Sequence, residues 1–218
     1  MCGRYKRAQG KEALVRRFRI ERVETDLFTP RYNLAPSQEA LVVLLQDGAR
    51  VLTSMRWGLV PAWAKDGSPG PINARAETLA QRPMFKRLLA SRRCLVPADG
   101  FYEWKRIPGQ KGKQPNLFTV GDGGLFAFAG IWDAWISPEG EEIRTFAIVT
   151  TEPNEVTKPV HDRMPVVLKE PGETVWLEDA SRAASLLLPY AGEMRAEPVS
   201  TLVNSPGNDV PECAQGRP

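Results

Sequence analysis

The sequence has little histidine and little cysteine, and this scarcity excludes several kinds of site. Its 218 residues include one histidine, His161, and three cysteines, at positions 2, 94 and 213. The cysteines are widely spaced without a CxxC pair, and a lone histidine cannot complete a zinc cluster, so we expect neither a disulfide scaffold nor a metal. The chain also lacks GxGxxG, Walker A and HExxH motifs, and we expect no cofactor.

Long apolar runs and a strong charge excess are also missing. No apolar stretch approaches the about 18 residues that a membrane span needs. The segment 6–25 is charged throughout and has no apolar core of a signal peptide, so we expect a cytoplasmic protein that does not enter a membrane. A net charge of +3 permits an anionic partner without requiring one.

Proline and tryptophan are plentiful, with 19 and six residues, and predict many turns and short strands. Strands and helices follow one another without regular βαβ alternation, so a doubly wound parallel sheet is disfavoured. We expect a single α+β domain over 1–218 with a mainly antiparallel, barrel-like β-sheet core, flanking helices, a loosely ordered tail over 204–218 and an exposed Cys213. The predicted helices are 10–20, 77–92 (interrupted near Pro83), 152–158 and 180–190. The predicted strands are a hairpin over 39–57 turning at Asp47-Gly48, then 94–106, 116–120, 124–136, 143–151, 162–168 and 194–200. We expect 28–38 to be extended but irregular and 64–77 to be a loop.

The first residues, "MCGRY", place Cys2 directly behind the initiator methionine. Removal of Met1 would leave Cys2 with a free α-amine beside its thiol. An α-amine has a pKa of about 7.7–8.0, so roughly 15–25% of it is unprotonated near neutral pH and can attack an aldehyde to give a Schiff base. The neighbouring thiol can then close a five-membered thiazolidine.

Position alone leaves other uses of Cys2 open. The thiol can instead attack an amide with the α-amine as general base, as in class II glutamine amidotransferases, which also begin Cys-Gly. Alternatively, Cys2 is a second residue that only packs.

Six motifs occur in order along the chain: "MCGRY", "RYNLAPSQ", "MRWGLVPAW", "INARAET", "PMFKRLLASRRCLVPADGFYEWK" and "HDRMPVVL". Together they resemble the SRAP family, whose members are named for the SOS response and cross-link to abasic sites in DNA. The resemblance extends from residue 2 to about residue 168. It implies one SRAP-like domain that acts on single-stranded DNA containing abasic sites.

The resemblance also implies four catalytic residues. Cys2 matches the nucleophile, Asn73 of "INARAE" the active-site asparagine, Glu103 of "GFYEWK" the active-site glutamate, and His161 the histidine that assists proton transfer. The aromatic neighbours of Glu103 independently suggest burial, which would raise its pKa into the range useful for acid–base work.

DNA contacts are predicted beside these residues. Arg4, Arg75 and Arg163 each lie two positions beyond a catalytic candidate, and residues i and i+2 of a strand point the same way. Each could therefore bind a phosphate next to the reaction. Trp63 and Trp104 are expected to stack on bases near the lesion, with core packing as the competing explanation.

The function that follows is a covalent sensor and protector of abasic sites. A Schiff base at the sugar invites β-elimination and strand breakage, whereas closure of the thiazolidine removes the imine. We expect a monomer, associated with the nucleoid when bound to damaged DNA, with weak lyase activity and a peptidase activity confined mainly to self-processing. An N-terminal-nucleophile amidohydrolase and a non-enzymatic single-stranded DNA-binding module remain as alternatives.

Overall fold

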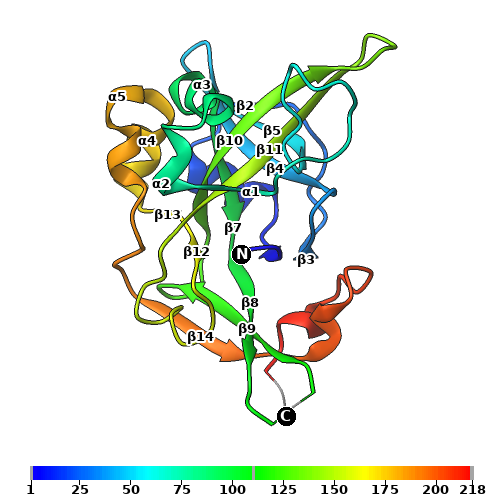
Figure 1. Ribbon diagram of the computed structural model, residues 1–218, viewed down its shortest axis with the longest axis vertical. Coiled ribbons are helices and arrows are strands. Elements are labelled where there is room, and N and C mark those ends of the chain that lie inside the picture. Colours follow the sequence, from blue (N-terminus) through cyan, green and yellow to red (C-terminus); the bar gives the residue numbers. More distant parts are fainter. Residues whose placement is uncertain (1, 110, 217–218) are drawn as a thin grey trace.

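The computed structural model describes residues 2–109 and 111–216 and has an α+β architecture (Figure 1). Most of its strand pairs are antiparallel, as expected. The strands are β1 (Tyr5–Arg7), β2 (Arg22–Val23), β3 (Arg31–Leu34), β4 (Glu39–Gln46), β5 (Ala49–Trp57), β6 (Asn73–Arg75), β7 (Arg93–Ala98), β8 (Gly100–Arg106), β9 (Lys113–Val120), β10 (Phe126–Ile136), β11 (Glu142–Thr151), β12 (Met164–Pro165), β13 (Val167–Leu168) and β14 (Met194–Pro198).

Five of these strands close into a barrel. They pair in the order β11-β10-β7-β4-β5, and β5 then pairs in parallel with β11, Thr145 opposite Arg56 and Phe146 opposite Trp57. The hairpin of β4 and β5 turns at Asp47 and Gly48, whose φ angles of 52° and 79° are those of a type I′ turn. The barrel-like core predicted from the sequence is confirmed.

The barrel strands bury apolar side chains on both of their faces. Successive residues of a strand point to opposite faces, and in β4 Leu41 and Val43 enter one cluster while Val42 and Leu44 enter another. Helices cover the first cluster, and the second continues into the other sheet of the protein.

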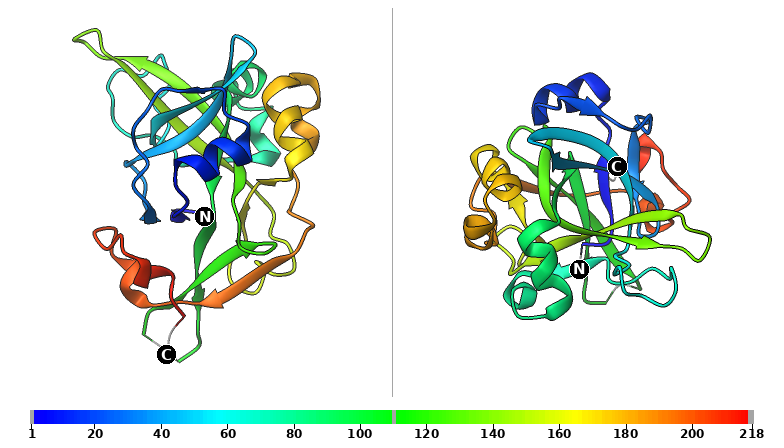
Figure 2. Two further views of the ribbon diagram at one scale, coloured as in Figure 1. Left: turned by 180° about the vertical axis from the view of Figure 1, so that it is seen from behind. Right: turned by 90° about the horizontal axis from the view of Figure 1, so that it is seen from above.

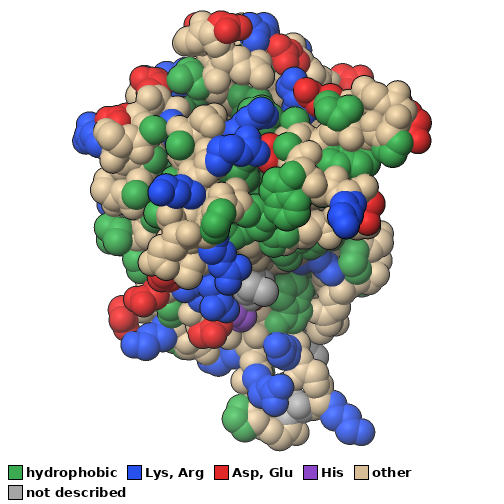
Figure 3. Space-filling view, turned by 45° about the horizontal axis from the view of Figure 1, so that its top comes forward, with side chains coloured by type: hydrophobic (Ala, Val, Ile, Leu, Met, Phe, Trp, Pro, Cys, Tyr) green, Lys and Arg blue, Asp and Glu red, His purple; other side chains and the backbone are tan. Residues whose placement is uncertain are grey.

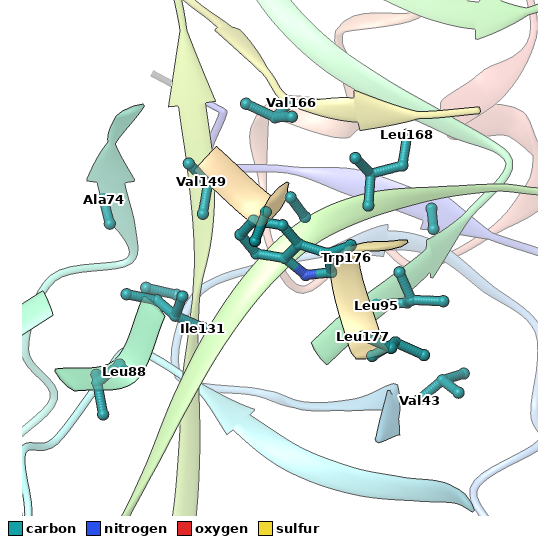
Figure 4. Close-up of a cluster of buried hydrophobic side chains, with 14 of the residues drawn as sticks. Val43, Ala74, Leu88, Leu95, Ile131, Val149, Val166, Leu168, Trp176 and Leu177 are labelled. Carbon is teal, nitrogen blue, oxygen red and sulfur yellow. The ribbon is translucent and has the colours of Figure 1, made fainter. Parts of the chain in front are cut away.

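Helices flank the barrel on opposite sides, with α1 facing away from α3 in the view from above (Figure 2). In the first cluster, the Trp176 indole lies among side chains that include Leu95 and Val149, and its Nε1 donates to the carbonyl of Cys94 at 2.9 Å (Figure 4). None of the helices in the described ranges is both long and apolar enough to cross a membrane. The helices are α1 (Lys11–Phe18), α2 (Ala76–Leu79), α3 (Pro83–Ser91), α4 (Glu170–Glu178) and α5 (Ala180–Ala183), with 3₁₀ turns η1 (Ala184–Leu186), η2 (Thr201–Asn204) and η3 (Pro211–Ala214).

A second sheet has the strand order β14-β9-β8-β1-β3. It is joined to the barrel where the barrel strand β7 continues into β8. The junction is Asp99, whose buried carboxylate accepts the amide of Ala8 at 2.7 Å and lies 3.2 Å from Nζ of Lys6. A Cβ on the next residue, Gly100, would lie 2.7 Å from Cδ1 of Leu117, so glycine permits the close approach of β8 and β9. This junction directs β8 toward the N-terminal strand.

The C-terminal tail is not loose up to Gly216, contrary to our expectation. The side-chain amide of Asn33 is buried and donates to the carbonyls of Val203, Ser205 and Asn208 at 3.2, 2.9 and 2.7 Å. Cys213 is fully buried rather than exposed. Polar bonds to backbone carbonyls hold this segment, and such bonds leave no apolar periodicity in a sequence.

Other predicted elements were wrong in part. The segment 152–158 contains turns and no helix: the Asn154 side chain accepts the amides of Val156 and Thr157 at 3.2 and 2.9 Å, as a helix N-cap does, but the chain continues only as turns. The helix expected over 180–190 ends as a 3₁₀ turn at Leu186, shortly before Pro189. Helix α4 and the short strands β1, β2 and β6 were not predicted, and β3 lies in the segment 28–38 that was expected to be extended but irregular.

Candidate active site

The N-terminal strand places Cys2 against the second sheet. Tyr5 of β1 pairs antiparallel with Phe101 of β8, and the amide of Tyr102 donates to the Arg4 carbonyl at 3.0 Å, so the residues ahead of β1 run along the part of β8 that contains Glu103. Cys2 is fully buried, and burial raises the pKa of its thiol, with the negative charge of Glu103 as the second cause. The predicted removal of Met1 concerns a residue outside the described ones.

Glu103 is a buried carboxyl group, with 3% of its surface exposed. Burial raises its pKa from 4.5 to about 7, in the direction that its aromatic neighbours suggested. The backbone amide of Trp104 and the charge of Lys113 oppose this rise. A carboxyl group that titrates near neutral pH can both donate and accept a proton during a reaction.

His161 lies in the loop between β11 and β12 and faces this carboxyl group. Its Nε2 is 3.9 Å from Oε2 of Glu103, and its Nδ1 accepts the amide N–H of Arg163 at 3.0 Å. Because an amide can only donate, the neutral ring holds its proton on Nε2, the nitrogen nearer Glu103. Nδ1 also lies 2.9 Å from the exposed carboxylate of Asp162. Burial lowers the pKa of the imidazole, which favours this neutral form.

Asn73 begins β6, the strand that runs parallel to β11, where it lies opposite Ile148. Its Nδ2 is 3.5 Å from the Ile148 carbonyl, while its buried Oδ1 has no hydrogen-bond partner among the described residues. Asn73 therefore presents a free acceptor near the end of β11, from which the loop to His161 departs. Glu103 links the other two candidates, because its charge acts on the Cys2 thiol and its Oε2 lies 3.9 Å from His161 Nε2, whereas Asn73 belongs to the adjoining strand β6.

Two of the predicted DNA-contacting arginines, Arg75 and Arg163, differ in how their guanidinium groups are bonded. Arg163 forms a two-pronged ion pair with Glu77, at 2.6 and 2.9 Å, and also donates to the Thr150 carbonyl at 2.7 Å. Arg75, which pairs with Thr150 in the strand register, is exposed and donates no side-chain hydrogen bond to a described residue. Arg75 can therefore take a phosphate as it stands, while Arg163 must share its guanidinium with Glu77.

The third arginine, Arg4, is held by the C-terminal tail. Its guanidinium donates to Oδ1 of Asn33 at 2.9 Å and to the Val203 carbonyl at 2.7 Å. The same part of the tail fixes Trp104, whose Nε1 donates to Oδ1 of Asn204 at 2.7 Å. Arg4 also lies 5.9 Å from the centre of the Trp104 ring, so the tail and these two side chains form one connected unit.

The tryptophans divide between core and surface. Trp63 is 71% exposed and available for stacking, and Trp104 is partly buried. Trp57 belongs to the core: it is fully buried, its ring stacks on Phe146, and its Nε1 donates to the Ile72 carbonyl at 2.9 Å.

Sequence reasoning missed two charged residues beside the site. Lys113 begins β9, and its positive charge acts on both Glu103 and His161. It lies in the segment 107–115, to which we had assigned no role. Glu77 was missed as well, although its place two residues after Arg75 in "INARAET" could have drawn attention to it.

The histidine reaches the surface close to several lysine and arginine side chains (Figure 3). No group of three or more His, Cys, Asp or Glu side chains that could hold a metal occurs in residues 2–109 and 111–216. What the arrangement offers is a thiol next to a carboxyl group that exchanges protons near neutral pH and a neutral imidazole. These groups suit proton transfer during attack of a nucleophile on a carbonyl.

The family model described as SOS response associated peptidase (SRAP) matches residues 1–206. The chain belongs to the SRAP family. Abasic site processing protein YoqW of Bacillus subtilis is 44% identical over 223 residues, which cover 99% of each chain.

A more distant relative and two solved structures are also similar to this chain. Abasic site processing protein HMCES of the mouse is 32% identical over 232 residues, covering 87% of this chain and 66% of HMCES. A crystal structure of a protein from Bacteroides thetaiotaomicron has a TM-score of 0.86 at 26% identity and covers 99% of this chain and all of that one. A phage-related protein from Bordetella bronchiseptica has a TM-score of 0.72 at 31% identity, covering 91% of this chain and 94% of the other.

Proposed function

We propose that this protein processes abasic sites in single-stranded DNA by linking itself covalently to them through Cys2. The observation on which the proposal rests is the placement of the Cys2 thiol beside Glu103, with Nε2 of His161 3.9 Å from the same carboxyl group. The names of the relatives YoqW and HMCES, abasic site processing proteins, support the choice of substrate.

The proposed reaction begins once Met1 has been removed. The α-amine of Cys2 adds to the aldehyde of the ring-opened sugar, and the carbinolamine formed loses its hydroxyl group as water to give an imine. Glu103 in its neutral form supplies the proton for that water. Its pKa of about 7 keeps both protonation states populated at neutral pH, so the same group can first accept a proton from the attacking amine.

Thiazolidine formation completes the link. The Cys2 sulfur bonds to the imine carbon while the thiol proton moves to the imine nitrogen, so amine, thiol and aldehyde become one ring and one water molecule. Burial keeps the thiol protonated, and a base must therefore take its proton as the sulfur attacks. Ionised Glu103, assisted by the neutral His161 imidazole, is the group placed to do so. Ring closure removes the imine and with it the route to β-elimination.

Further parts of the proposal concern the DNA and the protein's other chemistry. Arg4, Arg75 and Arg163 would hold the strand by its phosphates, and Trp63 and Trp104 would stack on bases beside the lesion. The protein would act as a monomer that associates with the nucleoid when bound to damaged DNA. Peptidase activity would be limited to its own N-terminus, and lyase activity would be weak.

Intact mass spectrometry tests the proposal directly. We expect loss of Met1, and a denaturation-resistant adduct with an oligonucleotide bearing one abasic site that is absent in Cys2→Ala. Retained Met1, or no adduct with Met1 removed, would refute the mechanism. Glutamine hydrolysis would then indicate an amidohydrolase, and salt-sensitive DNA binding that survives Cys2→Ala a simple binding module.

A further inference from the structure

Beside the site, a hollow of about 200 Å³ opens between β6 and the start of α3. Asn73 lines one side of it, so the hollow adjoins the proposed reaction site. Pro71, Met84 and Phe85 give it an apolar lining. A hollow of this size has room for several water molecules or for the edge of a base.

Two arginines form the rim of this hollow, Arg75 and Arg82. Both are exposed, and neither forms an ion pair or donates a side-chain hydrogen bond to any residue that the structure describes. They differ in this from Arg163, whose guanidinium is bound to Glu77. The charge of Arg75 also acts on Glu77 and lowers the pKa of that carboxyl group, but the hydrogen-bonded ion pair of Glu77 is the one with Arg163.

The two arginines that line the hollow occupy similar positions in the backbone. Arg75 ends β6 and precedes α2, and Arg82 precedes α3, so each lies at the entry to a helix. Helix α3 starts with Pro83 and has no acidic residue in its first turn, so its positive end reinforces the charge of Arg82. An anion that enters the hollow therefore meets positive charge from two directions, above an apolar surface.

We infer that Arg82, together with Arg75, binds the backbone phosphate of the nucleotide next to the abasic site, and that the hollow receives the sugar or base of that nucleotide. The inference rests on the proposed function, because Asn73 both lines the hollow and belongs to the proposed reaction site. Single-stranded DNA is the ligand of matching chemistry: arginine pairs bind phosphate oxygens, and bases favour apolar and aromatic surfaces. Duplex DNA would keep its bases stacked and out of a hollow of this size.

The test measures binding without the covalent step. A fluorescent single-stranded oligonucleotide with a tetrahydrofuran residue in place of the abasic sugar has no aldehyde and cannot cross-link. Full-length protein is compared with Arg82→Gln, with the charge-retaining Arg82→Lys, and with Lys86→Gln. Lys86 is the matched control, because it is an exposed cation of the same helix that does not line the hollow. Unchanged melting temperatures verify that each variant is folded.

One phosphate contact on single-stranded DNA changes the slope of log affinity against log salt by about 0.7, which at 0.1 M salt is about fivefold in affinity. We expect Arg82→Gln to bind the oligonucleotide about fivefold more weakly and to reduce the slope of log affinity against log salt by about 0.7. Arg82→Lys should lose less affinity, and Lys86→Gln should bind almost as tightly as the unaltered protein. We also expect the Arg82→Gln effect to vanish when the oligonucleotide is truncated at the lesion on one side and to persist when it is truncated on the other.

Equal losses in Arg82→Gln and Lys86→Gln, or an effect that survives both truncations, would overturn the inference. A natural abasic oligonucleotide tested in parallel distinguishes failure of this inference from failure of the proposed function. Cross-linking without an Arg82 effect rejects the hollow and leaves the proposed function standing, whereas neither binding nor cross-linking by the unaltered protein rejects both.

Discussion

Glu103→Gln should stabilise the protein at alkaline pH while it slows cross-linking to abasic DNA. The carboxyl group is buried, and its pKa is raised from 4.5 to about 7. A raised carboxyl pKa means that the folded state binds the proton more tightly than the unfolded state does. The associated stability is complete below pH 4.5 and is lost as the pH rises through 7. Above that pH the folded protein must hold a buried negative charge, which glutamine removes.

The magnitude follows from the two pKa values. At 1.36 kcal/mol for each pKa unit, a rise from 4.5 to about 7 costs the folded state about 3 kcal/mol once Glu103 is fully ionised. Most of this cost, about 2–3 kcal/mol, develops between pH 5 and pH 8. For a protein of this size it corresponds to about 5–10 °C in melting temperature.

The assay is a set of thermal or urea denaturation curves at half-unit steps from pH 5 to pH 8 for both proteins. The quantity of interest is the difference in unfolding free energy between Glu103→Gln and the unaltered chain, because all other titrating groups are common to the two. We expect this difference to increase with pH in favour of the variant. Cross-linking to abasic DNA should fall by about 10²–10⁴-fold, the usual contribution of a general acid–base group. A stability difference that stays flat across the pH range would refute the account of Glu103.

Three further predictions address the nucleophile, the phosphate contacts and the tail. Cys2→Ser, from which Met1 is still removed, should give a less stable adduct and more strand breakage on a gel, because the imine persists; adducts as durable as those of the unaltered protein would contradict thiazolidine closure. Glu77→Gln should raise affinity for the tetrahydrofuran oligonucleotide by about fivefold at 0.1 M salt and steepen its salt dependence, since it frees the Arg163 guanidinium; unchanged binding would show that Arg163 contacts no phosphate. Asn33→Ala removes three bonds to tail carbonyls and should destabilise the protein by about 2–3 kcal/mol and expose Cys213 to thiol reagents; protection equal to that of the unaltered chain would show that the tail is held by other means.

The sequence predicts those parts of the fold that are determined locally. The hairpin over 39–57 follows from its Asp47-Gly48 turn, and the break near Pro83 follows from the missing amide of proline. Long-range polar contacts leave no such pattern. Periodicity therefore could not predict that Asn33 holds the tail by hydrogen bonds. Nor could it predict the turns in which Asn154 accepts backbone amides.

The candidate site was accessible from sequence only through its motifs. Residue types identify a possible nucleophile at Cys2 and a possible acid at Glu103, but the 3.9 Å approach of His161 depends on a loop that follows β11. The influence of Lys113 could not be foreseen either. It reaches the site because β9 pairs with β8, a relation that the intervening loop sequence does not reveal.

The bonds between Arg4 and the tail also determine when the site can form. Arg4 and Val203 are 199 positions apart, and their contact is 2.7 Å long. A ribosome must therefore release almost the whole chain before the surroundings of Arg4 and Trp104 are complete. Contacts so distant along the chain form late in folding, because closing so long a loop is entropically costly. The nucleophile is translated among the first residues and reaches its final environment among the last, so a nascent chain would carry a reactive N-terminus that has not yet acquired its DNA-binding surface.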